Sequence, residues 1–226
     1  KSCMLMRPDA LVFDLDGTLI DSAADLALIL NRLLAERGRA EVSPDSVRGM
    51  IGNGIGALVA RGFAATGAPL DAATHAAAAR RFLDLYLDPD RPHHAKPYPG
   101  VIETLTGFAA QAIPMGVCTN KTQVATEMVL REAGLAAFFD SVVGHDRAPM
   151  PKPAPAHVLA VCRALGDPQA AVMIGDSVND LQAGQAAGLK VVLVTYGYGT
   201  PQALAAADAR IDRFDALPVA LAGLAA

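Results

Sequence analysis

The chain has 226 residues, of which 52% are hydrophobic and 19% charged, and its formal net charge is −4. This composition supports one large domain or a core with a smaller insert, and it excludes a disordered chain. A negative net charge without a long lysine and arginine run argues against a nucleic-acid surface. Because no apolar run could span a bilayer and no signal peptide is recognisable, we expect a cytoplasmic protein without membrane partners.

The three cysteines are scattered and form no CxxC pair. Cys118 and Cys162 lie in apolar segments, where a free thiol behaves as a small hydrophobic side chain. We therefore expect buried, reduced cysteines rather than a disulfide or a metal site.

The first predicted element is a buried strand at residues 11–13, which leads directly into Asp14 and Asp16. Residues i and i+2 of an extended backbone point to the same side, so these two carboxylates are crowded. Like charges at that separation repel unless a cation lies between them or one is protonated. Since open α/β sheets place their chemistry at the carboxyl ends of parallel strands, the stretch indicates a metal site, an acid/base pair, or both.

The next part of the chain is predicted to be helical. Apolar residues recur at helical spacing between Ser22 and Gly38, with Asp21 or Ser22 available as the cap. Residues 55–65 and 72–87 are rich in alanine and poor in β-branched residues, which also favours helices. Prolines and glycines over residues 88–100 end this block, in which no strand is predicted.

From residue 101 onward, helices and strands alternate. Helices are predicted over 101–111, 121–132, 153–165 and 178–187, and strands over 113–118, 141–143, 171–174 and 191–194. The strands are continuous apolar runs, typical of a sheet covered on both faces. The pattern predicts an α/β protein with a doubly wound parallel sheet. We expect a core of residues 1–20 and 97–226, with an α-helical cap of residues 21–96 inserted after the first strand.

Three further polar segments fall at predicted strand ends or helix starts. They are Thr119-Asn120-Lys121, Pro151-Lys152-Pro153 and Gly175-Asp176-Ser177-Val178-Asn179-Asp180. With Asp14 and Asp16 they would gather four carboxylates, an ammonium and a hydroxyl at one sheet edge. A hard divalent cation relieves such repulsion, and Mg²⁺ commonly combines a few carboxylates with water and a substrate phosphate.

The remaining groups at this edge suit a phosphate. Lys152, Thr119 and the backbone N–H groups near Asn120 can bind its oxygens. Charge neutralisation, positioning and a nucleophile are what phosphoryl transfer needs, and an aspartate can be that nucleophile.

Together these segments resemble the haloacid dehalogenase superfamily of phosphatases. The carriers are DLDGTLIDS at 14–22, TNK at 119–121, PKPAP at 151–155 and GDSVNDLQAG at 175–184, and the resemblance covers nearly the whole chain. Within the superfamily the chain is most similar to bacterial phosphoglycolate phosphatases, through GNG at 52–54, YPGV at 98–101 and VTYGYG at 194–199. The resemblance implies a Rossmann-like core with a cap, and Mg²⁺-dependent hydrolysis of a small phosphorylated metabolite, first of all 2-phosphoglycolate.

The resemblance also implies roles for the four aspartates. Asp14 would attack phosphorus, forming an aspartyl-phosphate, and would bind Mg²⁺. Asp16 would protonate the leaving alcohol and then activate water, while its backbone carbonyl binds the metal. Asp176 would complete the metal shell, and Asp180 would be a water-mediated or indirect partner.

Other residues would contact the phosphate or the leaving group. By resemblance, Thr119 would bind the transferring phosphoryl group and Lys152 would neutralise it, beside Asn120. The segment Gly52-Asn53-Gly54 opens a helix, where it acts either as a hinge or as a loop that presents N–H groups to the substrate. A small anionic substrate also calls for a cation from the cap. Of Arg48, Arg61, Arg80 and Arg81, we select Arg61.

Several alternatives stay open. Dehalogenases of this superfamily lack the second aspartate, so Asp16 favours phosphate esters, because an alcohol leaving group needs a proton. A sugar-phosphate phosphatase, a pyrophosphatase or a β-phosphoglucomutase-like enzyme would use the same motifs. A non-catalytic phosphate-sensing module is a remote alternative, since it would be smaller and would have no cap. The sequence allows a monomer or a homodimer.

Overall fold

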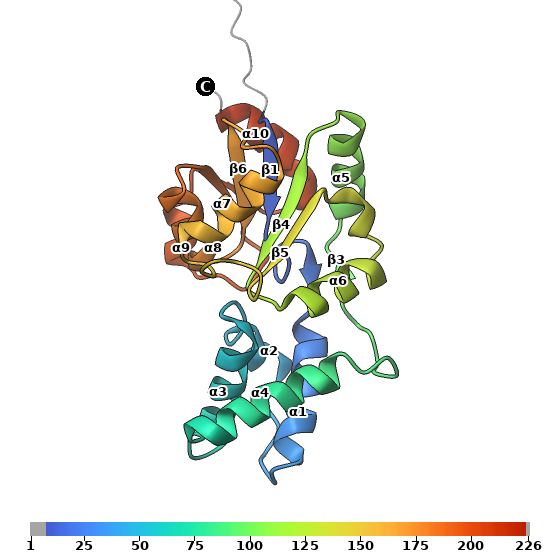
Figure 1. The fold of residues 1–226 in the computed structure, drawn as a ribbon, viewed down its shortest axis with the longest axis vertical. Coiled ribbons are helices and arrows are strands. Elements are labelled where there is room, and N and C mark those ends of the chain that lie inside the picture. Colours follow the sequence, from blue (N-terminus) through green and yellow to red (C-terminus); the bar gives the residue numbers. More distant parts are fainter. Residues whose placement is uncertain (1–7, 225–226) are drawn as a thin grey trace, which may run out of the picture.

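The computed structural model describes residues 8–224, which form an α/β core beside a helical lobe (Figure 1). The main sheet has six strands in the order β5-β4-β1-β6-β7-β8, and every pairing is parallel. The strands are β1 (Ala10–Phe13), β4 (Met115–Thr119), β5 (Ser141–Gly144), β6 (Ala171–Gly175), β7 (Lys190–Val194) and β8 (Ala209–Ile211). The predicted doubly wound parallel sheet is therefore confirmed.

Both faces of this sheet are covered by helices, which explains the continuous apolar strands. In β1, Leu11 and Phe13 face one hydrophobic cluster, whereas Ala10 and Val12 face the other. The first face is packed by α5 (Val101–Ala110), α6 (Gln123–Glu132) and α10 (Leu217–Leu224), and the second by α7 (Pro155–Ala164), α8 (Val178–Ala186) and α9 (Pro201–Ala205). Two 3₁₀ turns, Ala136–Phe138 and Phe214–Ala216, complete the core.

Residues 21–96 lie at the carboxyl edge of the sheet and are called the insert below (Figure 1). The insert contains α1 (Ala23–Ala35), α2 (Pro44–Arg48), α3 (Gly54–Ala65) and α4 (Ala72–Tyr86), and α1 packs against each of the other three. Its two ends meet as the antiparallel strands β2 (Ile20–Asp21) and β3 (Lys96–Pro97). The sequence pattern did not predict these strands, since two residues give no periodicity to detect.

Two element boundaries differ from the sequence prediction in ways that matter for the site. Helix α6 begins at Gln123, not at residue 121, which leaves Lys121 in the loop after β4. Helix α7 begins at Pro155, not at residue 153, so Lys152 and Pro153 lie outside it. The later start of α6 leaves Lys121 free to turn toward the sheet edge, while Lys152 lies in the loop before α7, outside the helix in both the prediction and the structure.

Two other expectations can be compared with the structure. Cys118 and Cys162 are buried free thiols, as expected, while Cys3 lies outside the described residues. Over residues 8–224, none of the helices combines the length and apolar character needed to cross a membrane.

Candidate active site

Asp14 begins the loop that follows β1, one of the two central strands of the sheet. Its backbone N–H donates to the carbonyl of Ile174 on β6 (2.9 Å), so the strand ladder fixes its position, and its side chain is buried. The loop turns sharply at Gly17, where φ is +86°. A Cβ atom there would clash with the Oδ2 of Asp176. Gly17 therefore supplies both the turn and the room for a third carboxylate.

Lys152 provides the buried counter-charge for Asp14. Its Nζ lies 2.9 Å from Asp14 Oδ1 and 2.6 Å from Asp180 Oδ1. Its backbone is fixed on both sides: the N–H donates to His157 Nδ1 (3.2 Å), and the carbonyl accepts from the Asn120 side-chain amide (3.0 Å). Burial alone would lower the pKa of Lys152, but the two aspartates raise it above its ordinary value, so the ammonium stays charged.

Asp176 and Asp180 stand at the junction of β6 and α8. The Oδ2 of Asp176 accepts from the backbone N–H of Tyr198 (2.6 Å). Asp180 forms a capping box with Ser177, because its Oδ2 accepts from the Ser177 N–H (3.0 Å) and hydroxyl (2.8 Å). Its Oδ1 accepts from Lys152, so both oxygens of Asp180 are already hydrogen-bonded.

The carboxylates in this cluster are arranged as a cation site would require. One oxygen from each of Asp14, Asp176 and Asp180 lies within 4.8 Å of the others, and all three residues are buried. Burial and then repulsion by Asp180 raise the pKa of Asp14 to about 7, although Lys152 opposes the shift. Burial and the same repulsion raise the pKa of Asp176. One ammonium does not balance three buried carboxylates, and an all-oxygen donor set fits a hard divalent cation.

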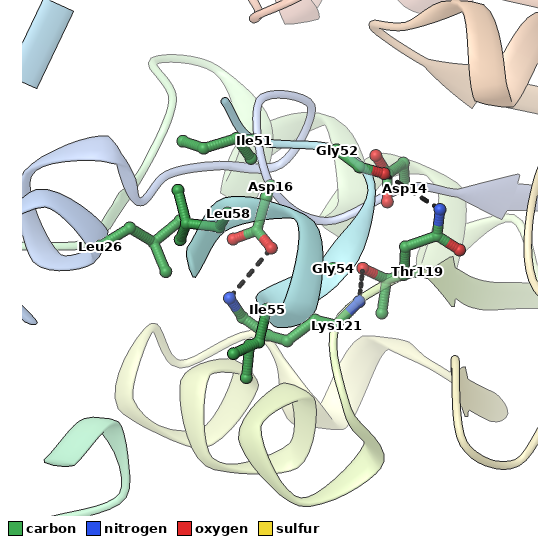
Figure 2. A pocket seen from close by; sticks show the side chains of 11 residues that line it. Asp14, Asp16, Leu26, Ile51, Gly52, Gly54, Ile55, Leu58, Thr119 and Lys121 are labelled. Carbon is green, nitrogen blue, oxygen red and sulfur yellow. Dashed lines mark hydrogen bonds and ion pairs between the residues drawn. The ribbon is translucent and has the colours of Figure 1, made fainter. Parts of the chain in front are cut away.

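Asp16 has its own lysine partner. Its Oδ2 lies 2.9 Å from the Nζ of Lys121, and its Oδ1 accepts from the Ser22 hydroxyl (2.6 Å). Figure 2 shows the Asp16 carboxylate and the Lys121 ammonium facing each other. Lys121 is buried, and its Nζ lies 4.8 Å from the centre of the Tyr86 ring, which belongs to α4 of the insert.

The place of Lys121 in the site was not predicted from the sequence, although the residue belongs to the TNK motif at 119–121. Lys121 was predicted to be the first residue of a helix, and no role in the site was assigned to it. In the structure it follows Thr119, whose hydroxyl accepts from the Lys121 N–H (3.2 Å), and it turns inward (Figure 2). Its position could have indicated this role, because Lys121 follows Thr119 and Asn120 at the end of a predicted strand.

The insert reaches the core through its glycine loop. The carbonyl of Gly52 accepts from the side-chain amides of both Asn120 and Asn179, each at 3.0 Å. These two asparagines follow β4 and β6, so two hydrogen bonds tie the loop to the core. The pair of hydrogen bonds is called the clasp below. Gly54, with φ of +80°, starts α3 directly beside the clasp.

The expected contacts of Asn53 and Arg61 with the site are not found among the described residues. Arg61 is exposed and turns back along its own lobe, donating to the carbonyl of Met50 (2.7 Å) and to Asn53 Oδ1 (2.8 Å). Neither Arg61 nor Asn53 lines the cavity described next. Helical spacing gave the distance of Arg61 from the glycine loop but not the direction of its side chain.

A small cavity of about 40 Å³ lies between the core and the insert, over the two catalytic candidates of β1 (Figure 2). It is lined by Asp14, Asp16, Leu26, Ile51, Gly52, Gly54, Ile55, Leu58, Thr119, Asn120 and Lys121. The core contributes the polar side chains, and the insert contributes apolar side chains and glycines. The space enclosed between the core and the insert is small.

Comparison with known proteins agrees with this geometry. Residues 11–194 match the profile of the family described as haloacid dehalogenase-like hydrolase. A phosphoglycolate phosphatase of Caulobacter vibrioides is 46% identical over 189 residues, which cover 83% of this chain and 79% of that protein. The phosphoglycolate phosphatase of Agrobacterium fabrum is 37% identical over 212 residues, 93% of this chain and 91% of that protein.

Solved structures show the same architecture. A predicted phosphoglycolate phosphatase from Haemophilus somnus superposes with a TM-score of 0.86 at 30% identity, over 95% of this chain and 98% of that one. The structure of CbbY from Rhodobacter sphaeroides in complex with phosphate superposes with a TM-score of 0.76 at 25% identity, over 93% and 96%. The chain belongs to the haloacid dehalogenase-like hydrolase family. Its curated relatives in Caulobacter and Agrobacterium are named for one activity, phosphoglycolate phosphatase.

Proposed function

We propose that this protein is a Mg²⁺-dependent phosphatase that hydrolyses 2-phosphoglycolate through an aspartyl-phosphate intermediate. The observation that carries the proposal is the pair of carboxylates after β1, each with its own buried lysine. Asp14 is 2.9 Å from Lys152, and Asp16 is 2.9 Å from Lys121. Two aspartates in different surroundings can take different roles in one reaction.

In the first half of the reaction, a carboxylate oxygen of Asp14 attacks phosphorus and the bond to the leaving oxygen breaks. Lys152 balances the negative charge on Asp14 and on the phosphoryl oxygens, and the Thr119 hydroxyl is free to donate a hydrogen bond to one of them. Asp16 delivers a proton to the departing alkoxide, which becomes the alcohol product.

In the second half, the acyl phosphate on Asp14 must be hydrolysed. Asp16, now a carboxylate, removes a proton from water as the water oxygen bonds to phosphorus and the Asp14–phosphorus bond breaks. Inorganic phosphate leaves and Asp16 is again protonated, so the cycle closes. The hydrogen bonds from Ser22 and Lys121 hold the Asp16 carboxylate in place for both transfers.

The carboxylates of Asp14 and Asp176 and the backbone carbonyl of Asp16 would hold the Mg²⁺ ion. Asp180 would act indirectly, because its oxygens already hold Lys152 and the start of α8. When bound, the ion supplies positive charge that stabilises the phosphoryl oxygens.

The second aspartate argues for a phosphate ester rather than a haloacid. A halide departs without a proton, whereas an alkoxide is a poor leaving group unless it is protonated. Asp16 is half-buried, and two donors fix its carboxyl group beside the cavity, where a proton can pass to the departing oxygen.

The insert is proposed to act as a cap. It covers the cavity with Leu26, Ile55 and Leu58, and the clasp of Asn120 and Asn179 on Gly52 holds it against the core. A closed cap excludes bulk water, which favours transfer to the aspartate over leakage of the reactive intermediate.

The substrate assignment rests on the small cavity and on the relatives named phosphoglycolate phosphatase. Its test is a kcat/KM panel of 2-phosphoglycolate, hexose phosphates, nucleoside monophosphates and pyrophosphate, measured with Mg²⁺ and after chelation by EDTA. We expect 2-phosphoglycolate to lead the panel, and EDTA to remove an activity that Mg²⁺ restores. A leading sugar phosphate would overturn the substrate, and full activity in EDTA would overturn the metal requirement.

A further inference from the structure

The cavity has one cation, Lys121, whose role beside Asp16 in the proposed reaction does not use its whole hydrogen-bonding capacity. Of the lining residues, all within the described range 8–224, only Lys121 is positively charged. The insert supplies the apolar walls Leu26, Ile51, Ile55 and Leu58 but no cationic side chain to this cavity. A recognition element for an anionic leaving group therefore has to come from the core.

The contacts of the Lys121 ammonium in the structure do not use all of its hydrogen-bond donors. An ammonium carries three N–H groups: the ion pair with Asp16 at 2.9 Å uses one and the Tyr86 hydroxyl faces another, which leaves one for a ligand. Its stem is buried, and the Tyr86 ring lies 4.8 Å from Nζ, so the charge is held in place rather than solvated. A fixed charge with an unused donor beside an apolar wall is suited to binding an anion.

The position of Lys121 also matches the chemistry of a short leaving group. If Asp16 protonates the ester oxygen, that oxygen lies within hydrogen-bond reach of Asp16, whose Oδ2 is itself 2.9 Å from Lys121 Nζ. In glycolate, the carboxylate is separated from that oxygen by a single methylene carbon. An anion so close to the ester oxygen falls within ion-pair reach of Lys121.

We propose that Lys121 binds the carboxylate of a two-carbon leaving group and thereby sets the specificity of the enzyme for 2-phosphoglycolate. This inference rests on the proposed function above. The low polarity of Leu26, Ile55 and Leu58 strengthens the ion pair. The same walls offer no hydrogen bonds to the hydroxyl groups of a sugar, so they disfavour polyhydroxylated phosphates.

The test compares 2-phosphoglycolate with its amide, phosphoglycolamide, which has the same number of non-hydrogen atoms and no carboxylate charge. For Lys121→Met we expect kcat/KM to fall about 100-fold on 2-phosphoglycolate. If the substitution also displaces Asp16, the rates with 2-phosphoglycolate and with phosphoglycolamide fall by the same factor. The ratio of the two kcat/KM values therefore reports only on recognition of the carboxylate. The matched control is Lys190→Met, an exposed lysine on β7, which should leave the ratio unchanged.

The outcomes separate this inference from the proposed function. If the wild-type enzyme does not favour 2-phosphoglycolate over the other phosphates, the proposed function fails. If it does, and Lys121→Met keeps the wild-type ratio of 2-phosphoglycolate to phosphoglycolamide, the role of Lys121 is wrong.

Two further variants guard against misfolding and confirm that charge is the cause. Lys121→Gln keeps a donor for Asp16 while removing the charge, and it should lose the preference as Lys121→Met does. Lys121→Arg keeps the charge and should retain most of the preference. Equal ratios in all three variants would overturn the inference.

Discussion

Asp16 Oδ2 lies 2.9 Å from Lys121 Nζ, so the second aspartate of the DLD motif is paired independently of the first, which contacts Lys152. The first pair contacts the carboxylate cluster through Asp180, and the second lies where the cavity meets the apolar side chains of the insert. This separation divides the site into a phosphoryl side and a leaving-group side, and the predictions below follow from it.

Replacing Asp16 by alanine should make the rate depend strongly on the leaving group. General acid catalysis contributes about 10²–10⁴-fold where the leaving alkoxide is poor. We expect a loss of that order with 2-phosphoglycolate and a much smaller loss with p-nitrophenyl phosphate, whose phenolate departs unaided. The measurement is kcat for both substrates, and equal losses would argue against Asp16 as the acid.

His157 should make stability depend on pH. Burial lowers the pKa of His157 from 6.5 to about 4, and the neutral ring accepts from the Lys152 N–H while its Nε2 contacts the Val143 carbonyl. Between these pH values the unfolded chain binds a proton that the folded chain does not, so stability falls as the pH drops. Between pH 7.5 and 5 this loss should be about 2 kcal/mol greater in wild type than in His157→Gln. Urea unfolding checks this, and parallel pH profiles would contradict it.

The clasp on Gly52 should affect substrate affinity. Asn179→Ala removes one of the two amide donors to the Gly52 carbonyl and leaves the other, from Asn120. A hydrogen bond worth about 1 kcal/mol corresponds to a roughly fivefold shift toward the undocked loop. We expect KM to rise by about that factor. Gln182→Ala, an exposed position on the same helix, is the control, and a KM equal in the two variants would exclude the clasp.

A buried ion pair in the insert should matter for stability rather than for catalysis. Asp25 on α1 accepts from Arg91 Nη1 (3.2 Å) and from the backbone N–H groups of His94 and Ala95, and Arg91 also pairs with Glu132 on α6. Asp25→Ala leaves a buried guanidinium without one of its partners, at a cost of about 3 kcal/mol in the free energy of unfolding.

The matched control for that variant is Asp45→Ala, on the exposed surface of α2, which should change stability by less than about 1 kcal/mol. Urea unfolding measures both variants. An Asp25→Ala protein as stable as the control would show that the ion pair contributes nothing to the fold.

The core and its sheet edge could be predicted because their signals are local. Buried parallel strands read as apolar runs, and polar residues stand out at their carboxyl ends: Thr119 ends β4, and Asp14 and Asp176 directly follow β1 and β6. The parallel pairing of β1 with β4 and β6 brings these ends together without further information.

The cavity could not be predicted in the same way, because its contents depend on contacts between distant segments. Lys121 is buried, and Tyr86 from the insert packs against its ammonium. Arg61 was expected at the site from its spacing along α3, but its side chain turns back to Met50 and Asn53. Helical periodicity fixes which residues share a face, and it does not fix where a long side chain ends.

The most direct test of the account is whether phosphate becomes covalently attached to Asp14 during turnover. Wild-type enzyme mixed with Mg²⁺ and saturating 2-phosphoglycolate is quenched in acid, and its peptides are analysed by mass spectrometry. The account predicts that the peptide containing Asp14 gains one phosphoryl group. It also predicts that Asp14→Asn, with an unchanged urea midpoint, shows no adduct and a kcat lower by about 10³-fold or more. Turnover near the wild-type rate by Asp14→Asn, or an adduct on another residue, would contradict it.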